Sequence, residues 1–214
     1  MPRAPRLERL VLPELETGDA TDIAPHSDVE LAVFDNVDLA AESAVGVSLV
    51  ECEITASNLD DTDFTGARFA DSRLTRITAP RFTLARAFLR NVHLTDSRIG
   101  ALDLFDGKVR SMVVENCKIE LVNLRGCDVR DVEFRGCIIG ELDFGGATVT
   151  RVSFTDCRVE TLDVHRAELS DVDLRGLTIG NVHHLDGLRG STMDTDQAVG
   201  LVNHFAAHLG VTLD

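Results

Sequence analysis

The five cysteines are the first residues in this sequence whose chemistry suggests a site. Their number is odd and no two of them form a CxxC pair. Three recur at intervals of twenty residues, at Cys117, Cys137 and Cys157. A stack of thiols would suit a soft metal ion or a redox relay. Free cysteine is also a small apolar residue that is often buried, so we favour the alternative that these residues fill a repeating core.

The histidines offer a second opportunity for chemistry. His204 and His208 lie four residues apart, a helical spacing that could hold a metal ion. No third ligand stands near them, and a histidine near a helix C-terminus also interacts favourably with the helix dipole. His183 and His184 are interpreted in the same way. Because the chain also contains no GxSxG and no P-loop sequence, we expect no catalytic residue, no cofactor, no metal and no enzyme activity.

A five-residue repeat organises the whole chain and decides where these side chains lie. Every fifth residue from Val29 to Ile179 gives 31 central positions, of which 29 are Leu, Ile, Val or Phe and two are Ala. The frame never slips over this length. A helix repeats about every 3.6 residues and a strand about every 2. A period of five therefore indicates a coil that turns a corner every five residues.

Two further positions repeat with the centres. Two residues before each centre lies a second inward position, where large and small residues alternate and where all five cysteines occur, including Cys52 and Cys127. This alternation indicates four faces, with opposite faces alike, and hence a coil of twenty residues. Two residues after the centre come residue types that tolerate tight corners. These corner residues are Gly46, Asp61, Gly66, Asp71, Asn91, Asp96, Asp106, Asn116, Gly126, Asp131, Gly136, Gly146, Asp156, Asp171 and Gly176.

Segments such as Thr62–Gly66 (TDFTG) and Val172–Gly176 (VDLRG) resemble the repeat of the pentapeptide-repeat family. The resemblance covers residues 27–180. It implies an all-β solenoid, namely a right-handed quadrilateral β-helix of seven to eight coils, followed by a C-terminal α-helix. Pro80 lacks a backbone donor and follows the small centre Ala79, so we expect a bend or a bulged corner there.

The period is lost at both ends, which divides the chain into an N-terminal cap segment (1–26), the repeat (27–182) and a C-terminal cap with a dimerisation helix and tail (183–214). At the N-terminus, Leu7, Leu10, Val11 and Leu12 are expected to cover the first coil. At the other end, Asp194 is placed to cap a helix that stops at Gly210.

This C-terminal end resembles the helices of pentapeptide-repeat proteins of the MfpA and Qnr types, which dimerise there. The resemblance implies a homodimer held by apolar residues at helical spacing. The dimerisation residues would be Val199, Leu201, Val202, Phe205 and Leu209. The alternative is a helix that folds over the last coil of a monomer.

The charge of the chain restricts its partners. Thirty-six Asp and Glu against 21 Lys and Arg give a formal net charge of −15, which disfavours nucleic acid and anionic membranes and favours a basic protein surface. The twenty-residue register aligns four acids into a candidate partner-binding column, with arginines on a neighbouring face. The acidic column is Asp63, Asp103, Asp143 and Asp163, and the arginine column is Arg90, Arg110 and Arg130.

Apolar residues also occur at outward positions. Phe88 and Phe105 break the polar pattern near one corner, and Ile138 and Leu121 form a weaker pair, so we expect a contact patch at the aromatic corner. The N-terminus lacks the apolar stretch of a signal peptide, and no window of 18 residues is apolar enough to span a membrane, which points to the cytoplasm.

Two functions are consistent with these observations. The one we favour is a non-enzymatic scaffold that binds another protein through a flat face or the aromatic corner. The other is implied by the resemblance alone: proteins of the MfpA and Qnr types mimic duplex DNA, bind DNA gyrase and protect this topoisomerase from quinolone-type antibiotics. The acidic column agrees with mimicry, whereas the arginine column and the absence of Qnr-type loop insertions weigh against it.

Overall fold

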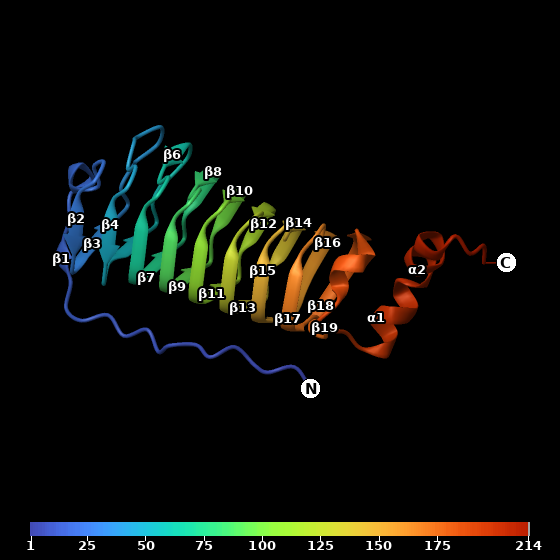
Figure 1. The fold of residues 1–214 in the computed structure, drawn as a ribbon. Coiled ribbons are helices and arrows are strands. Elements are labelled where there is room, and N and C mark those ends of the chain that lie inside the picture. Colours follow the sequence, from blue (N-terminus) through green and yellow to red (C-terminus); the bar gives the residue numbers. More distant parts are fainter. Residues whose placement is uncertain (214) are drawn as a thin grey trace.

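The computed structural model describes residues 1–213 and shows a long β-solenoid with helices at its C-terminal end (Figure 1). The first sheet is parallel and has twelve strands. They are β1 (Glu16–Thr17), β2 (Asp28–Glu30), β3 (Ala32–Asp35), β4 (Ser48–Val50), β5 (Glu53–Thr55), β7 (Arg68–Thr75), β9 (Phe88–Thr95), β11 (Lys108–Glu115), β13 (Asp128–Arg135), β15 (Thr148–Thr155), β17 (Glu168–Asp173) and β19 (Ser191–Thr192).

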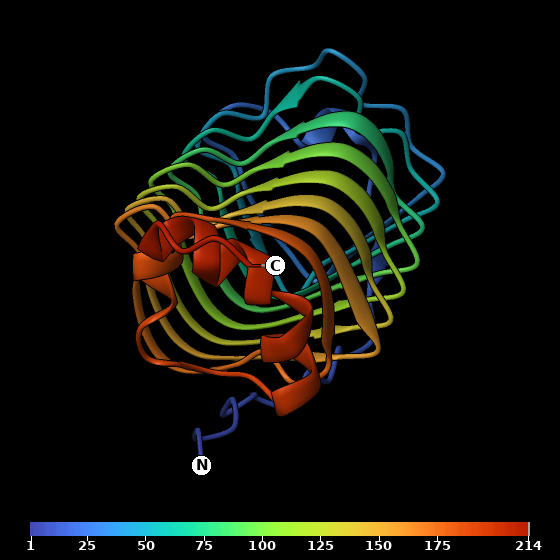
Figure 2. The ribbon, with the colours of Figure 1, turned by 90° about the vertical axis from the view of Figure 1, so that its right-hand side faces the viewer.

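The second sheet is also parallel and has seven strands. They are β6 (Thr62–Asp63), β8 (Thr78–Thr83), β10 (Arg98–Asp103), β12 (Lys118–Asn123), β14 (Ile138–Asp143), β16 (Cys157–Asp163) and β18 (Leu177–His183). Within the repeat, each paired residue lies opposite the residue twenty positions later, as in Arg98 with Lys118 and Lys118 with Ile138. The end strands pair at other offsets, sixteen for Glu16 with Ala32 and nineteen for Val172 with Ser191. Viewed along the axis, the coils superimpose as closed loops (Figure 2). The expected solenoid with a twenty-residue coil is therefore confirmed.

The coil count is larger than the repeat alone indicates. The longest ladder runs from β1 through β3 and β5 to β19 and contains ten strands, which makes about nine turns rather than seven to eight. The additional strands Glu16–Thr17 and Ser191–Thr192 lie outside residues 27–180. Backbone hydrogen bonds extend the ladder there although the side-chain period has ended, because the ladder does not depend on side-chain type.

The interior is filled by the two inward positions of each repeat. The central residues and those two positions before them form one buried cluster from Ile23 to Leu201. The phenylalanines stack in successive coils, and the ring centroids of Phe134 and Phe154 lie 5.1 Å apart. All five cysteines are buried within this cluster as free thiols. Their packing role follows from the alternation of large and small residues along the coil.

The corners adopt the left-handed backbone that the sequence pattern predicts. Of the fifteen predicted Gly, Asp and Asn corner residues, all except Gly176 have a positive φ. Residues with larger side chains also adopt this backbone, including Glu51 (φ 51°) and Arg76 (φ 54°). A left-handed non-glycine residue costs about 1–2 kcal/mol, so the ladder on either side must hold these corners in place.

Pro80 does not interrupt the rod. The ladder pairs Ala79 with Ile99 and Arg81 with Ala101, and it omits only the residue between them. The same omission recurs in later coils, at Gly100 and again at Gly140. The expected bulged corner at Pro80 is therefore absent: Pro80 belongs to a row of equivalent positions that form no ladder pair, and the register continues unchanged past it.

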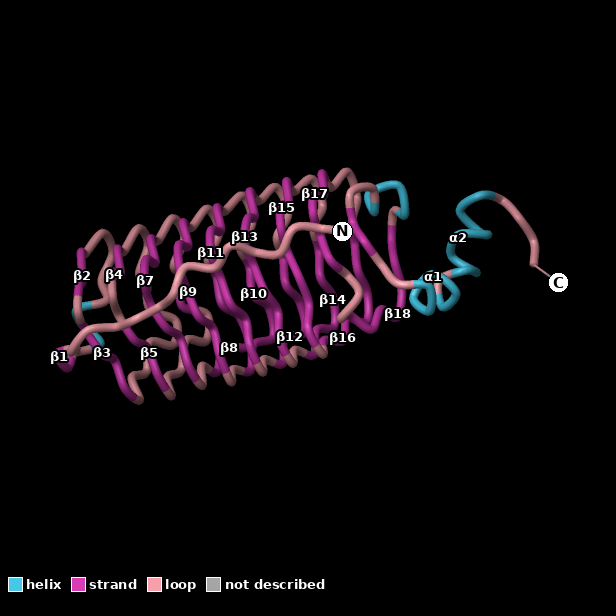
Figure 3. Tube along the Cα trace, turned by 90° about the horizontal axis from the view of Figure 1, so that it is seen from below, coloured by secondary structure: helices cyan, strands magenta, loops and turns pink. Residues whose placement is uncertain are grey.

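The N-terminal segment lies elsewhere than expected. Residues 1–15 run back along the outside of the rod, from β1 toward the C-terminal end (Figures 1 and 3). The backbone N–H of Arg6 donates to Asp131 at 2.8 Å and that of Glu8 donates to the hydroxyl of Ser111 at 2.7 Å. The prediction that Leu7, Leu10, Val11 and Leu12 cover the first coil was wrong, because these residues belong to an extended segment docked on the side of later coils.

Short helices close the ends. A 3-10 turn, η1 (Ala20–Asp22), begins with a capping box at Asp19, and a second, η2 (Leu185–Leu188), follows β18. The expected single C-terminal helix is two helices, α1 (Thr195–Gly200) and α2 (Val202–Leu209), separated at Leu201. Asp194 caps α1 as predicted, and Gly210 (φ 69°) ends α2. None of the helices in residues 1–213 is long and apolar enough to cross a bilayer.

A glycine in the second sheet tests how tightly the coils are stacked. A Cβ at Gly140 would lie 2.5 Å from the carbonyl oxygen of Glu120 in the preceding coil. We expect Gly140→Ala to lower the free energy of unfolding by about 1–3 kcal/mol, because the backbone must shift to admit the methyl group. Urea titration monitored by circular dichroism measures this change.

The matched control is Gly200→Ala, where a Cβ meets no atom within 4 Å. That variant should be neutral or more stable by about 0.5–1 kcal/mol, since alanine is the better residue in a helix. Equal effects of the two substitutions would contradict the close contact between coils.

Candidate interaction surfaces

The predicted acidic column is aligned, but its carboxylates are engaged within the fold. The ladder connects Asp103 with Asn123, Asn123 with Asp143 and Asp143 with Asp163. The carboxylate of each acid accepts a hydrogen bond from the backbone N–H two residues later, at 2.9 Å for Asp63 and 3.1 Å for Asp103. Each acid thereby stabilises the turn that follows it.

Asp143 and Asp163 are the least available members of this column. Asp143 is only 4% exposed, accepts from the Gly145 N–H at 2.7 Å and forms an ion pair with Arg125 at 3.0 Å. Burial raises the pKa of Asp163, but hydrogen bonds from the backbone of His165 and the ring of His184 outweigh burial and lower it below the usual value. The expectation of a freely accessible acidic stripe must therefore be corrected, because these carboxylates cap turns.

The arginine column is neutralised in a similar way. Arg90 pairs with Asp71 and lies 3.5 Å from Glu8, whereas Arg110 and Arg130 both pair with Asp128. Further ion pairs join neighbouring coils or neighbouring positions, such as Arg151 with Asp131 at 2.6 Å. From residue 68 to residue 180 the rod thus carries seventeen Lys and Arg against seventeen Asp and Glu, and many of these charges are paired.

The acidity is concentrated at the N-terminal end of the rod. Between Leu10 and Ala67 the chain holds fourteen Asp and Glu residues and no Lys or Arg. Ten of these acids are exposed and none is buried. Within residues 1–213, only Glu53 and Asp61 among the fourteen form ion pairs, with Arg73 at 3.7 Å and Arg81 at 3.3 Å. We call this region the acidic end.

The acids of the acidic end do not form one column. They lie at many different positions of the first coils, so a comparison of equivalent residues in successive coils does not group them. They are Glu14, Glu16, Asp19, Asp22, Asp28, Glu30, Asp35, Asp38, Glu42, Glu51, Glu53, Asp60, Asp61 and Asp63. A running charge along the chain would have found them.

The aromatic corner is only partly exposed. Phe105 is 43% exposed, but Phe88 is half-buried beneath the guanidinium of Arg68, which lies 5.3 Å from the centre of its ring. In the second, weaker pair, Ile138 is 56% exposed and Leu121 is half-buried. These residues do not join into one broad apolar surface.

The C-terminal cap divides the predicted dimerisation residues into two sets. Leu201 is 2% exposed and Phe205 packs against the core, so both hold the cap to the last coil. Val199, Val202 and Leu209 are 65%, 46% and 73% exposed. Only this second set is available to a partner, and Leu201 must be removed from the predicted interface.

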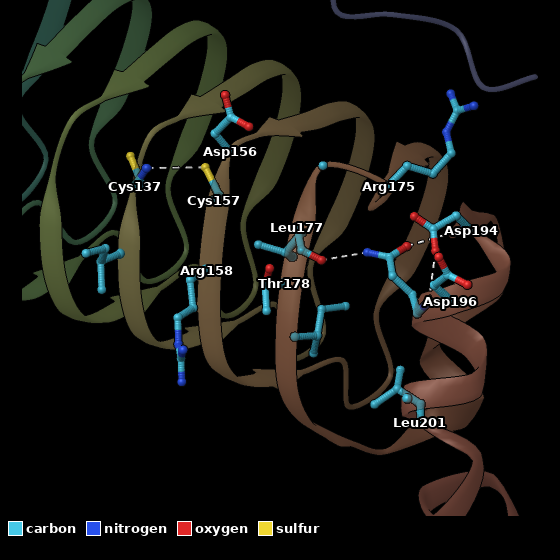
Figure 4. Close-up of a pocket in the computed structure, with 15 residues that line it drawn as sticks. Cys137, Asp156, Cys157, Arg158, Arg175, Leu177, Thr178, Asp194, Asp196 and Leu201 are labelled. Atoms are coloured by element: carbon cyan, nitrogen blue, oxygen red, sulfur yellow. Dashed lines mark hydrogen bonds between the residues drawn. The ribbon is translucent and has the colours of Figure 1, made fainter.

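A cavity of about 670 Å³ separates α1 from the last coils (Figure 4). The side chain of Gln197 crosses its edge and donates to the carbonyl oxygens of Leu174 and Leu177 at 2.5 and 2.6 Å. Cys137 and Cys157 are among the lining residues, and the hydrogen bond with Cys137 and then burial raise the pKa of the Cys157 thiol. Burial likewise raises the pKa of Cys127 to about 12, so these thiols are protonated and weakly nucleophilic.

Five of the seven histidines lie toward the C-terminal end of the chain, namely His165, His183, His184, His204 and His208. His184 lies 3.0 Å from Asp163, and His208 lies 3.2 Å from Asp186. His204 approaches Asn181 at 3.3 Å. In the described part of the chain, residues 1–213, no three or more His, Cys, Asp or Glu side chains are placed to hold one metal ion.

The turn-stabilising role of the acidic column leads to a test. We expect Asp143→Ala to lower the free energy of unfolding by about 1–3 kcal/mol, because it leaves the Gly145 N–H and the Arg125 guanidinium without their partner. The control is Glu160→Ala, at an exposed position of the same sheet. If chemical denaturation shows equal stability for both variants, Asp143 does not hold the turn.

Comparisons with known proteins agree with the repeat. A family model described as pentapeptide repeats (9 copies) matches residues 115–158. The solved structure of HetL, a pentapeptide-repeat protein involved in heterocyst differentiation regulation in the cyanobacterium Nostoc, is 16% identical, with 79% of this chain and 90% of that chain covered and a TM-score of 0.34. A trypsin-treated form of QnrB1, a plasmid-mediated fluoroquinolone resistance protein, is 16% identical, with 89% and 91% covered and a TM-score of 0.29.

No curated protein matches the chain. The matched family segment lies inside the unbroken frame of five, and its strands β12, β13 and β14 stack with the same register of twenty residues as the rest of the rod. This chain is therefore a β-solenoid built of pentapeptide repeats: residues 115–158 match the family model, and the same repeat continues on both sides of them.

Proposed function

We propose that this scaffold binds a protein partner that presents a basic surface, and that it does so through the acidic end. The observation that carries this proposal is the run of fourteen acidic residues without one Lys or Arg between Leu10 and Ala67. Twelve of these carboxylates form no ion pair within residues 1–213. Such a field attracts basic surfaces and repels nucleic acid, and it accelerates association with a complementary partner.

The rest of the rod supports this choice of surface. Its charges are of both signs and many are paired between or within coils, and its predicted acidic column caps turns. Paired surface charges are already screened and contribute little to attraction at a distance. The acidic end is therefore the part of the surface from which a long-range attraction originates.

Charge reversal at the acidic end tests this proposal. Asp28, Glu30 and Asp35 are exposed and form no ion pair in the described residues. We expect a variant with lysine at all three positions to retain at least about tenfold less partner when the tagged chain is purified from the cells that produce it. Quantitative mass spectrometry of the retained proteins, at low and at raised salt, measures the loss.

A second triple variant controls for net charge. Lysine at Glu141, Glu160 and Glu168 changes the charge by the same amount at exposed positions of the later coils. This variant should retain the partner that the first one loses. Equal retention by both variants, or a partner held through the later coils, would count against the acidic end.

DNA gyrase is the alternative identity of the partner, and the net charge of −15 is the observation that favours it. Under that hypothesis the purified chain changes gyrase supercoiling, or its inhibition by a quinolone, at about tens of micromolar. Lysine at Asp28, Glu30 and Asp35 should then weaken the effect more than the control triple does. An unchanged supercoiling reaction would exclude gyrase and leave the basic-partner proposal in place.

We also propose that two copies of the chain pair through the exposed apolar residues of the cap, Val199, Val202 and Leu209. The tail adds Val211 and Leu213, which are 52% and 50% exposed. Burying these side chains between two copies would remove apolar area from water at about 25 cal/mol per Å². The resemblance of this end to MfpA-type and Qnr-type proteins supports the same arrangement.

Sedimentation velocity tests the pairing. We expect Val199→Asp combined with Val202→Asp to convert a dimer into a folded monomer, because the charges would have to be buried. Asn203→Asp, which adds charge on the same helix at an exposed polar position, should remain dimeric. A wild-type chain that sediments as a monomer at about tens of micromolar overturns the proposal.

A further inference from the structure

The N-terminal segment has the form of a bound peptide. Residues 2–15, here called the strap, lie extended along the rod (Figure 3). Every half-buried residue of the strap is apolar, and its charged residues are exposed. The half-buried residues are Pro2, Pro5, Leu7, Leu10, Leu12 and Leu15. The strap therefore has an apolar side toward the rod and a charged side toward solvent.

The rod holds the backbone of the strap at intervals set by its coils. Asp171, Asp131 and Ser111 occupy the same corner in different coils and accept hydrogen bonds from the backbone N–H groups of Arg3, Arg6 and Glu8, at 3.1, 2.8 and 2.7 Å. From Arg3 to Arg6, three residues span two coils. An extended chain advances about 3.3 Å per residue and coils stack about 4.8 Å apart, so the two repeats are commensurate.

The corner column beneath the strap continues beyond these contacts. We call the acceptor residues Asn91, Ser111, Asp131 and Asp171 the strap groove; all have a positive φ, which gives them the same backbone orientation. Asn91 and Ser111 are only 3% and 5% exposed. The Oδ1 atom of Asn91 is buried and has no hydrogen-bond partner within residues 1–213. The strap groove thus contains one hydrogen-bond acceptor, the Oδ1 atom of Asn91, to which the strap does not donate.

One outward residue close in sequence to the corner residue Ser111 is apolar and almost completely buried. Val113 is 4% exposed although its position faces away from the core, whereas the equivalent residues one coil on either side, His93 and Glu133, are half-buried. The side of the rod therefore provides both polar acceptors and apolar surface for an extended chain.

The strap makes few strong contacts with the rod for a segment of fourteen residues. No strand of the sheets includes residues 2–15, and the ladder begins only with β1 at Glu16. Its ion pairs, Arg3 with Asp171 at 4.0 Å and Glu8 with Arg90 at 3.5 Å, are exposed and hence weak. A peptide with the same features can compete for the groove, because little of the fold depends on the strap.

We propose that the strap groove is a binding site for an extended peptide of a partner protein and that the strap is its built-in competitor. The partner peptide presents apolar residues at intervals of two or three, as the strap does, with arginines on its outer side. Its backbone N–H groups donate to Asp131, Ser111 and Asp171, and the next one donates to Asn91. This surface is separate from the acidic end, so the two proposals fail independently.

A labelled peptide of residues 1–15 serves as the probe, and fluorescence anisotropy measures its binding. The acceptor is the chain without residues 1–13; the core begins with Ala20 and Ile23, so the rod keeps its whole interior, and circular dichroism checks that it is folded. The peptide should bind this chain at least about tenfold more tightly than it binds the full chain, in which the strap competes. Equal binding to both chains, or none to either, overturns the proposal.

Substitutions in the groove locate the binding. Asp131→Gly and Asp171→Gly remove two acceptors and retain a residue suited to a positive φ. Together they should weaken peptide binding at least about tenfold. Arg151→Gln is the control: it breaks the Arg151 ion pair with Asp131 but leaves the carboxylate, and it should have no effect.

The full chain provides a measurement that does not depend on truncation. Trypsin cleaves after arginines, and Arg6 and Arg9 lie on the exposed side of the strap. The double glycine variant should release the strap more often and be cut there several-fold faster than the wild type and the Arg151→Gln variant, while the rod resists. An unchanged rate of cleavage would show that the groove does not hold the strap and would refute the proposal.

Discussion

The parallel backbone ladder between coils is the constraint on which the rest of the molecule depends. Within the repeat, each residue of the ladder lies over the one twenty positions earlier, about 4.8 Å away, so its side chain meets the equivalent side chain of the next coil. Inward, this favours columns of similar apolar residues. Outward, like charges placed over one another would repel, and opposite or neutral neighbours are favoured. The ion pairs between coils, such as Arg73 with Glu53 and Arg81 with Asp61, satisfy this requirement. Where like charges do lie over one another, as in the arginine column, carboxylates beside the column pair with them.

The acidic end meets the same constraint without any base. Its acids are separated along each column by uncharged residues: Asp28 pairs with Ser48, Glu30 with Val50 and Asp35 with Thr55. Repulsion between adjacent coils is thus moderated, although the field of the whole end remains negative. The later coils show that this fold accommodates charges of both signs, so the solenoid itself does not require an excess of acids at its N-terminal end. The difference between the two ends is the main reason for assigning the binding role to one of them.

The repeated features of the fold could be predicted from the sequence. The role of individual surface acids and the structure of the two ends could not. The period of five identified the buried residues, and the Gly, Asp and Asn residues marked fourteen corners with a positive φ. It could not show that the carboxylate of Asp143 turns back to its own chain, because an exposed acid and a turn-capping acid look alike in a column. It also misplaced Leu7 and Leu10, since apolar residues without a period indicate burial but not the surface that buries them. The cap helix was recognised, but its break at Leu201 divides the side chains in a way that helical spacing alone does not show.

The path of the strap has a consequence for the mechanics of the rod. In a linear array each unit touches only its neighbours, so coils can fray from either end with little effect on distant ones. The strap is covalently joined to the first coil and hydrogen-bonded to corners at Ser111, Asp131 and Asp171. It therefore connects the first coil to coils that do not touch it directly. Fraying of the first coil would therefore also release the strap from these distant corners, whereas loss of the strap would leave the rod folded.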